Sequence, residues 1–506
     1  MNLPGPVSAK KDYIPVFFFL FTAVFLAYAP IIRDPLIRDD YWLLGQVKNI
    51  GILQLWRLAY AQIIYFRPLG ELFYWLQWRL FGIDALPSHI FSLGLLALDA
   101  CLLFWLLQLL GQRRLTAFFA ALLFALAPID VESVTWSAVR FDLAALSFML
   151  MSLGFYYIFL RDGSPRAYLL ALLLALAAMM IKEPAMILVV MIPIMEIIYH
   201  GVGQKAGKGG RPGFRAAPRR WLPLLGVFFV YLSLRFAVLG GIGGATSVVG
   251  RPSLRASYHS AFAFLFPLSW LETGPDRAAW ALAFFLVAGL LGAGLLRALL
   301  KPRRQSSRRA IIFFGLFFLI SLAPVFPFVF ITGVPQSLAT SRYFFIPYFA
   351  FIAMIIIMLF DIFSLKRLLY IAVTVLSCLA IFDVWAIHRN NQPWERAAAV
   401  SGYILAQTQR LVPQPKPGAV FYYRGIPVMS GYLLFQNLTL EPALRIEYQR
   451  NDIRVCVEGD KCDKSLLDGA YVFRYESGRN NLILLSAPPA GVSPVTRTGE
   501  AEDNLR

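Results

Sequence analysis

Residues 14–42 read IPVFFFLFTAVFLAYAPIIRDPLIRDDYW, an apolar run followed closely by two adjacent carboxylates. The apolar part, 14–32, is long enough to cross a membrane, and it lacks the small-residue cleavage site of a removed signal peptide. It therefore predicts a retained first transmembrane helix. Acidic pairs are costly near hydrocarbon, so Asp39 and Asp40 are expected to serve a purpose where they stand.

The composition of the whole chain is that of a multi-pass membrane protein. Of its 506 residues, 58% are hydrophobic and only 15% are charged, and the mean hydropathy is +0.63. Soluble domains carry nearer a quarter of charged residues. The net charge of +18 lies largely in short loops between apolar runs, which indicates membrane topology and argues against nucleic-acid binding.

Apolar runs predict a membrane α-helical bundle of about eleven spans. We place them at 14–32, 88–110, 115–128, 141–160, 166–181, 184–200, 221–240, 278–299, 310–331, 343–361 and 368–387. Several are short enough to be tilted or broken. The basic clusters between them fall on one side if the amino terminus is cytoplasmic, so the positive-inside rule places Asp39, Asp40 and everything after about residue 388 outside the cytoplasm.

The outer segments differ from the inner ones in being long and aromatic. Within 40–85, aromatic side chains recur at roughly helical spacing, which predicts amphipathic helices lying in the interface. A second outer segment, 241–275, begins with glycines that we interpret as a mobile loop or lid, and Tyr258–Leu271 predicts another interfacial helix.

The composition changes after the last span. We predict a transmembrane catalytic domain over 1–388, a linker over 389–417, a small β-rich α/β domain outside the cytoplasm over 418–486, and a disordered tail over 487–506. Cys456 and Cys462 could pair if this domain lies in an oxidising space, and the sequence alone leaves the question open.

Charged residues gather at the outer ends of several spans. They are Asp39 and Asp40; Arg67; Asp130 and Glu132, leading to Arg140 and Asp142; Lys182 and Glu183; and Arg342 with Tyr343. Cations would hold phosphate oxygens and a carboxylate would take a proton from an attacking hydroxyl, so the set suits an anionic, lipid-linked substrate. Each group also has a structural explanation, such as a helix cap, a local Lys–Glu ion pair or a snorkelling arginine.

The order of these motifs resembles a known family. An Asp-Asp pair follows the first span, then Tyr65-Phe66-Arg67-Pro68-Leu69, then 127–134 (APIDVESV), then Lys182-Glu183, then 341–347 (SRYFFIP). This pattern is similar to the transmembrane and tetratricopeptide-repeat O-mannosyltransferases and, more broadly, to the GT-C superfamily of polyprenyl-phosphate-sugar-dependent glycosyltransferases. The resemblance covers roughly residues 14–400.

The resemblance implies inverting transfer of a sugar, mannose or similar, from undecaprenyl- or dolichyl-phosphate to a hydroxyl of a protein or glycan. It assigns the base role to Asp39 first and Asp40 second. Arg67, Arg140, Lys182 and Arg342 map near the donor phosphate, and Glu132, Asp130, Glu183 and Tyr343 support them. It further implies a multi-pass protein of a prokaryotic plasma membrane, with its C-terminal domain outside.

The chain also departs from the family. Ala127 and Asp130 replace histidines of the family's His-Pro-x-His-x-Glu-like stretch, and a small β-rich domain stands where tetratricopeptide repeats are expected, which leaves the acceptor open. Adjacent carboxylates can hold Mg²⁺ or Mn²⁺, although nothing else in the sequence demands a metal. A lipid-linked glycan polymerase or ligase, a transporter or flippase, and a non-catalytic scaffold remain as alternatives.

Overall fold

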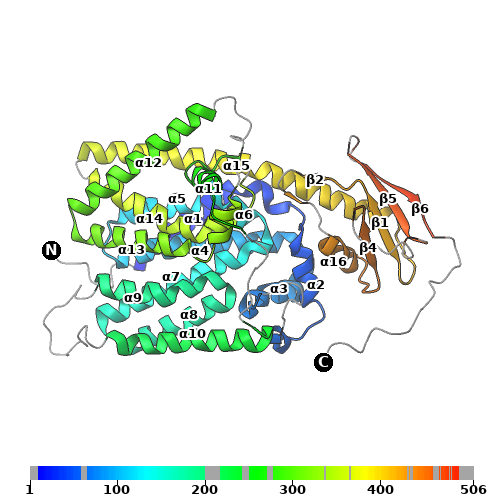
Figure 1. Cartoon of the computed structure of the whole chain (residues 1–506), viewed down its shortest axis with the longest axis horizontal. Helices are drawn as coiled ribbons and strands as arrows, with labels where there is room; N and C mark the ends of the chain where they lie inside the picture. The colour runs from blue at the N-terminus through cyan, green and yellow to red at the C-terminus, as the bar shows by residue number, and fades with distance from the viewer. Residues whose placement is uncertain are drawn as a thin grey trace. The chain divides into compact units, whose positions relative to one another are not determined.

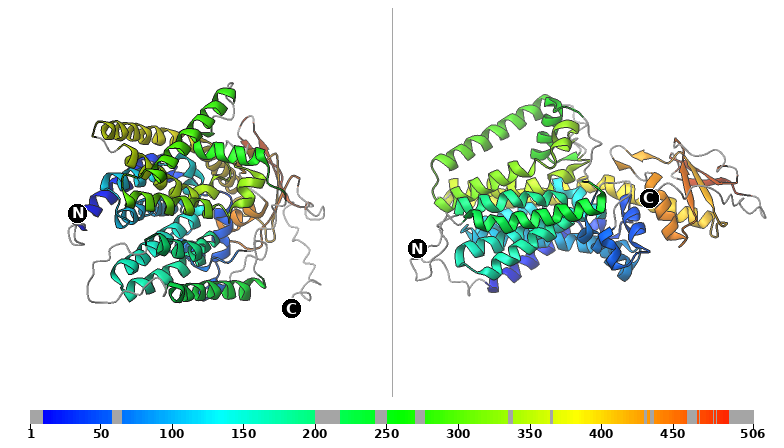
Figure 2. Two further views of the ribbon diagram at one scale, coloured as in Figure 1. Left: turned by 60° about the vertical axis from the view of Figure 1, so that its left-hand side comes forward. Right: turned by 60° about the horizontal axis from the view of Figure 1, so that its bottom comes forward.

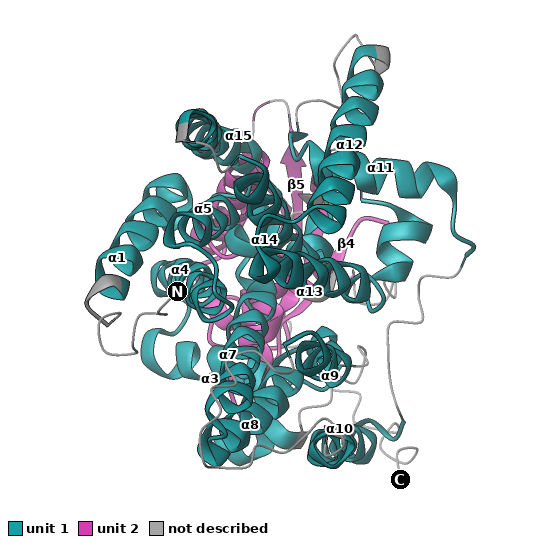
Figure 3. Cartoon of the chain, turned by 90° about the vertical axis from the view of Figure 1, so that its left-hand side faces the viewer, with its two compact units in different colours: residues 1–33, 50–392 teal, residues 34–49, 393–506 magenta. Residues whose placement is uncertain are grey.

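The computed structural model describes most of the chain, which forms two compact units (Figure 3). Unit 1 comprises residues 1–33 and 50–392, and unit 2 comprises 34–49 and 393–506. The described residues are 10–57, 65–199, 217–241, 250–269, 277–334, 338–363, 366–429, 432–433, 437–459, 467, 469–477, 479 and 481–488. Most of the glycine-rich loop and the disordered tail expected from the sequence lie outside these ranges.

Unit 1 is helical, and Figure 1 shows its helices running beside one another. Its α-helices are α1 (Lys10–Ala27), α3 (Pro68–Phe81), α4 (Ala85–Leu109), α5 (Arg114–Ala125), α6 (Val131–Thr135), α7 (Arg140–Asp162), α8 (Pro165–Ile181), α9 (Leu188–Tyr199), α10 (Ala217–Leu239), α11 (Leu254–Leu265), α12 (Arg277–Leu300), α13 (Gln305–Ser321), α14 (Phe345–Ile362) and the start of α15 (Lys366–Leu411). Shorter helical turns are η1 (Ala29–Arg33), η2 (Ile52–Arg57), η3 (Pro128–Asp130), η4 (Ser137–Val139), η5 (Glu183–Ile187), η8 (Pro327–Thr332) and η9 (Ser341–Phe344).

The prediction of a membrane α-helical protein is confirmed, whereas the count of eleven spans is not. Among the described residues, seven helices are long and apolar enough to cross a membrane by length and composition, and the shorter apolar helices Tyr13–Ala27 and Pro165–Ile181 accompany them. The runs expected at 184–200 and 310–331 are interrupted, since η5 precedes the 12-residue α9 and η8 follows the 17-residue α13.

Burial separates a central helix from a peripheral one. The apolar window that begins with α5 is 94% buried, whereas that of α12 is 6% buried. In keeping with this, Figure 2 shows α12 at an edge of unit 1. A helix that is apolar all round and unburied by protein is suited to face lipid. Unit 1 therefore combines a packed protein core with apolar surface suited to a bilayer.

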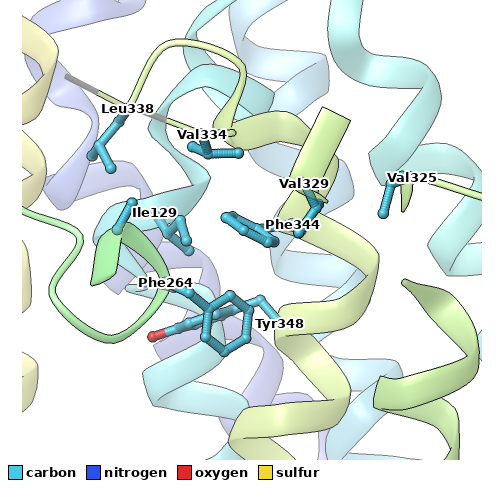
Figure 4. Packing of buried hydrophobic residues seen from close by; sticks show 10 residues of the cluster. Ile129, Phe264, Val325, Val329, Val334, Leu338, Phe344 and Tyr348 are labelled. Carbon is cyan, nitrogen blue, oxygen red and sulfur yellow. The ribbon is translucent and has the colours of Figure 1, made fainter. Parts of the chain in front are cut away.

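An apolar cluster fixes the segment that leads into α14. Phe264 of α11 packs edge-on against Phe344 and Tyr348, with ring centroids 5.0 and 5.1 Å away (Figure 4). Ile129 and Val329 belong to the same buried cluster. Because aromatic side chains bury large areas in such packing, the cluster holds η3, η8 and η9 as one rigid group.

Unit 2 contains the small α/β region expected from the sequence. A four-stranded sheet has the order β4-β1-β5-β6, formed by β1 (Val420–Arg424), β4 (Arg454–Val457), β5 (Tyr471–Glu476) and β6 (Asn481–Ser486). β1 is parallel to β4 and β5, and β6 is antiparallel to β5. A separate hairpin joins β2 (Val428–Met429) and β3 (Tyr432–Leu433). The parallel β1–β4 connection contains α16 (Asn437–Glu447), as a crossover requires.

The helix α2 (Asp39–Val47), which begins at the acidic pair, also belongs to unit 2 and contacts α16. A Cβ built on Gly45 would stand 3.4 Å from Cβ of Pro442, so the two helices approach closely there. The sequence grouped Asp39 and Asp40 with the transmembrane domain over 1–388, and the structure instead packs their helix with the C-terminal region. The remaining boundaries of the predicted domains stay predictions.

The predicted linker begins as helix. α15 continues from Lys366 through Pro393 to Leu411. Asn390 and Asn391, which fall within the predicted linker, are buried and bound to other segments: Asn390 Nδ2 donates to the carbonyls of Pro128 and Pro267 at 3.0 and 2.8 Å. These tertiary bonds outweigh the turn preference of asparagine, and a helix replaces the expected loop over 389–411.

Candidate functional site

A cavity of about 510 Å³ lies in unit 1, in the size range of small-molecule sites. Its wall is drawn from the segment before α3, the first turn of α7, the α8–η5 junction, α10, the end of α13 through η8, and the start of α14. The charged residues in its lining are Arg67, Asp142, Lys182, Glu183, Arg235 and Arg342. The fold thus brings together charged residues that are widely separated in the sequence.

Lys182 stands where helix α8 stops. Its backbone is extended, with φ −156° and ψ 139°. Pro184 prevents continuation of the helix because it has no N–H to donate and its ring would clash with the preceding turn. Lys182 Nζ donates to the Asp142 carboxylate. Burial lowers the pKa of Lys182 below its ordinary value, and Arg67 and Arg342 lower it further against the opposing effect of Asp142.

Glu183 bridges two arginines. Arg67 Nε and Nη2 lie 3.0 and 2.8 Å from Glu183 Oε2, and Arg235 Nη1 lies 3.2 Å from Oε1. Burial alone would raise the pKa of Glu183, but the two guanidinium groups hold it below its ordinary value. The carboxylate is therefore ionised, and it orients both arginines. Arg67 also lies over the Tyr65 ring, 4.1 Å from its centroid.

Arg342 is held by Glu132 and by aromatic rings. Its backbone N–H donates to Glu132 Oε2 at 2.9 Å, and Nη1 lies 2.5 Å from Oε1. The Tyr343 ring stacks on Phe328, with 3.9 Å between centroids. Just before this segment, Thr340 has φ +70°, a conformation that a β-branched residue rarely adopts. Such strain persists only where the surroundings impose it, and the apolar cluster around Phe344 does so here.

The charges at this cavity leave a positive excess. Four cations line it, and they are balanced by Asp142 and Glu183 in the lining and by Glu132 behind Arg342. One positive charge therefore remains when all seven groups are ionised, which is complementary to an anion carrying a single negative charge. Arginine forks match the geometry of phosphate oxygens, and lysine adds a compact point charge.

The rest of the cavity wall is apolar. Met186, Phe228, Leu232, Val325 and Ile346 contribute to it, from η5, α10, the segment after α13, and α14. An apolar wall beside a cationic cluster is suited to an amphiphile whose headgroup is anionic. The arrangement can bind such a molecule and stabilise negative charge that builds up on its phosphate during bond cleavage.

Arg140 and Asp130 are two of the five predicted site residues that lie outside this lining, together with Glu132, Asp39 and Asp40. Arg140 is 1% exposed; its Nε donates to the Ser137 carbonyl at 3.0 Å, its Nη2 donates to Ser88 Oγ, and its guanidinium lies over the Tyr74 ring. Asp130 is also 1% exposed, and neither of its oxygens has a hydrogen-bond partner among the described residues. Arg140 therefore has a packing role here, and its assignment to the donor phosphate stays a prediction.

Asp39 and Asp40 begin α2 in unit 2, and their surroundings differ. Asp40 is 2% exposed, and its Oδ2 accepts the Ile37 N–H at 3.1 Å. Asp39 is half-buried. The residue before them, Arg38, has φ +49°, so its backbone is strained, as that of Thr340 is. Of the two carboxylates, Asp39 is the more accessible.

Sequence reasoning did not single out Arg235, which lies in α10 within an apolar run. It is 4% exposed and completes the Glu183 bridge. The available signal was a basic residue inside a predicted span, because such residues are costly in hydrocarbon and usually face a partner.

A metal centre finds no support in the described residues, where no group of three or more His, Cys, Asp or Glu side chains could hold an ion. A divalent cation at the Asp39-Asp40 pair stays a prediction. Cys101 and Cys378 are free, whereas Cys456 is disulfide-bonded. Cys462 lies outside the described residues.

No protein-family model matches the chain, and no curated protein matches it either. Among solved structures, ArnT from Cupriavidus metallidurans bound to undecaprenyl phosphate is similar, with 13% identity, a TM-score of 0.48, and coverage of 89% of this chain and 87% of that one.

The Archaeoglobus fulgidus oligosaccharyltransferase is similar in two forms. Its complex with Zn and sulfate has 12% identity, a TM-score of 0.42, and coverage of 86% of this chain and 62% of that one. Its apo form has 12% identity, a TM-score of 0.45, and coverage of 89% and 65%. These similarities are low.

Proposed function

We propose that the chain is an integral membrane glycosyltransferase of the GT-C type that uses a polyprenyl-phosphate-linked sugar. The observation that carries this proposal is the cavity of about 510 Å³ that joins four cations to an apolar wall. Its charged part fits the phosphate, and its apolar part fits the first isoprene units of the lipid. The remaining isoprene units of the lipid would extend along the lipid-facing helices.

In the proposed reaction, the acceptor hydroxyl attacks the anomeric carbon and the bond from that carbon to the phosphate oxygen breaks. Negative charge builds on the departing phosphate, and Arg67, Lys182, Arg235 and Arg342 stabilise it. The hydroxyl proton passes to a carboxylate, and the products are the glycosylated acceptor and the polyprenyl phosphate. A single displacement inverts the anomeric configuration, and we propose a mannose-like hexose as the sugar.

We assign the base role to Asp39, with Asp40 as the alternative. Asp39 follows the first apolar helix and is half-buried, whereas an oxygen of Asp40 already accepts the Ile37 N–H. A general base needs a lone pair that can reach the substrate proton, so the more exposed carboxylate is favoured. This assignment rests on the environment of each carboxylate within unit 2.

The proposed orientation puts the amino terminus in the cytoplasm and the sheet of unit 2 outside, in a prokaryotic plasma membrane. The basic clusters between spans support it through the positive-inside rule. The disulfide at Cys456 supports it independently, because disulfides persist in oxidising spaces and are rare in the cytosol.

Replacement of the two acidic residues tests the proposal. We expect Asp39→Asn to lower the transfer rate by roughly 10²–10⁴-fold, the usual contribution of a general base. Asp40→Asn should lower it less and should chiefly reduce thermal stability, because it alters a buried hydrogen bond. The assay uses the purified protein in lipid nanodiscs and measures the polyprenyl phosphate that is produced by sugar transfer. Transfer at the wild-type rate by both folded variants would show that neither carboxylate is the base.

A deletion strain separates this function from its alternatives. Loss of the enzyme should leave a polyprenyl-phosphate monosaccharide accumulated in membrane lipids, measured by mass spectrometry, together with a missing sugar on glycoproteins or glycans. Accumulation of a lipid-linked oligosaccharide would instead indicate a polymerase or ligase. A lipid sugar retained on the cytoplasmic leaflet would indicate a flippase, and both outcomes would refute monosaccharide transfer.

A further inference from the structure

A second cavity lies at the opposite ends of α13 and α14, two of the helices that line the first. It measures about 130 Å³ and is lined by Gln112, Arg113, Arg303, Arg304 and Asp361, among others. Arg342 lies in η9, the turn that leads into α14, whereas Asp361 is in the last turn of α14. The two cavities are therefore separated by the length of a membrane-spanning helix. The first candidate site does not use any of these five residues.

Two helix N-termini meet at this second cavity. α5 begins after Arg113 and α13 begins after Arg304, and neither of these N-cap side chains accepts a backbone N–H of its helix. The first N–H groups of a helix have no partner within the helix, and the aligned peptide dipoles place partial positive charge there. Three arginines line the same space. Backbone dipoles and side chains therefore both favour an anion.

The cavity is held in shape by bonds between its walls. Gln112 Nε2 donates to the Ser306 carbonyl at 3.2 Å, which ties the α4–α5 loop to α13. The Arg303 N–H donates to Asp361 Oδ2 at 3.1 Å, which ties the α12–α13 loop to the end of α14. Gln112 and Asp361 are 8% and 6% exposed. This is a built pocket formed by two inter-helix loops and the end of α14.

Asp361 indicates that the ligand must also supply a hydrogen-bond donor. Its second oxygen, Oδ1, is buried and has no hydrogen-bond partner among the described residues. A buried carboxylate oxygen without a donor is costly, so a bound molecule that supplies one would stabilise it. The ligand should therefore carry a hydroxyl or ammonium group close to its phosphate.

The surroundings are suited to a lipid. Leu296 and Leu300, in the last turns of α12, are 59% and 71% exposed, and Leu115, in the first turn of α5, is 38% exposed. Acyl chains could lie along such surface while only the headgroup enters the small cavity. The basic loops here are those that the positive-inside rule assigns to the cytoplasm.

We propose that this second cavity binds a phosphate-bearing headgroup that also carries a hydroxyl or ammonium donor, at the membrane face opposite the glycosyl-transfer cavity. The arginines and the two helix N-termini hold the phosphate, and Asp361 accepts the donor. Phospholipids such as phosphatidylglycerol and phosphatidylethanolamine have this chemistry, and so do soluble phosphate esters. The proposal stands independently of the glycosyltransferase function.

Lipid binding to the purified full-length chain tests the proposal. Native mass spectrometry would compare phosphatidylglycerol and phosphatidylethanolamine with phosphatidylcholine, which has the phosphate but no donor. We expect the first two to bind more tightly than the third. The variant Arg113→Gln/Arg304→Gln should weaken their binding by roughly tenfold, in line with the loss of charged hydrogen bonds. Its matched control, Lys301→Gln/Arg308→Gln, removes equal charge from nearby residues outside the cavity lining and should bind as wild type does.

Two further measurements complete the test. Asp361→Asn should abolish the preference over phosphatidylcholine, and an unchanged preference would overturn the role of Asp361 as acceptor. Glycerol phosphate and inorganic phosphate, added in thermal unfolding assays, separate the sources: protection by glycerol phosphate equal to that by lipid identifies a soluble ester. Equal lipid and phosphate binding by the arginine variant and its control would overturn the proposal.

Discussion

The two cavities of unit 1 handle charge in different ways. The larger one sets four cations among three carboxylates and completes its wall with apolar side chains. The smaller one sets three arginines and two helix N-termini against the single carboxylate of Asp361. A site that must release its product gains from cations already shared with carboxylates, because each shared cation holds the departing phosphate less tightly. A site that retains a ligand gains from fixed backbone dipoles and from cations that outnumber the carboxylates.

The largest expected difference between the two cavities is in how much substitutions in each one lower the rate of sugar transfer. We expect Arg342→Gln combined with Glu132→Gln to lower the transfer rate by roughly 10²–10³-fold, since one electrostatic contact to the developing charge is lost. Removing both partners avoids leaving an uncompensated buried charge. Arg304→Gln, in the smaller cavity, should transfer at close to the wild-type rate. Equal losses in the two variants would show that the cavities do not differ in function.

An intermediate effect should come from Glu183. With Glu183→Gln, Arg67 and Arg235 lose the carboxylate they share, so both become available to a phosphate. We expect polyprenyl phosphate to bind roughly tenfold more tightly, as one charged hydrogen bond corresponds to about 1.5–3 kcal/mol. Transfer should slow because product release slows. The measurements are the Kd for polyprenyl phosphate and the burst amplitude, and weaker binding would contradict the sharing of cations.

The smallest effect should appear as a difference in pH dependence. Burial holds the pKa of Lys182 below that of an ordinary lysine, so this cation is charged at low pH and loses its charge earlier as the pH rises. Affinity for polyprenyl phosphate should therefore fall a few-fold as the pH rises, beginning below the range in which an ordinary lysine titrates, and Lys182→Arg should remove this fall because arginine stays protonated. Lipid binding at the smaller cavity, whose cationic side chains are arginines, should not change. An identical decline at both cavities would exclude Lys182 as its cause.

The sequence predicted most of the charged residues of the larger cavity, because it shows both their positions at the ends of apolar runs and the high energy of charges placed there. Arg67, Lys182, Glu183 and Arg342 stand at the ends of apolar runs on one predicted face, where charges are expensive, and the fold brings all four together. Arg140 stands at a comparable position, yet it turns toward Ser137 and Ser88. The apolar pattern locates helix α7, but it does not indicate whether the side chain of its first residue, Arg140, points into the cavity.

Other features depended on contacts that no local pattern contains. Arg235 escaped attention because its partner Glu183 is 52 residues away in sequence. Asn390 falls in the predicted linker, whereas its bonds to Pro128 and Pro267 hold it within a helix. The helix α2 was assigned to the transmembrane part by proximity in sequence, whereas its contact with α16 belongs to unit 2. Long-range packing decided all three cases.

The length of α14 also relates the protein to the thickness of its membrane. Its 18 residues measure about 27 Å at 1.5 Å per residue, slightly less than a typical hydrocarbon core of about 30 Å. Because this helix joins the two charged ends, a thicker, sterol-rich bilayer would draw phosphate-binding groups into hydrocarbon or force local thinning. The chain should accordingly be most active in thin bilayers, and reconstitution in lipids of graded acyl length would reveal that optimum.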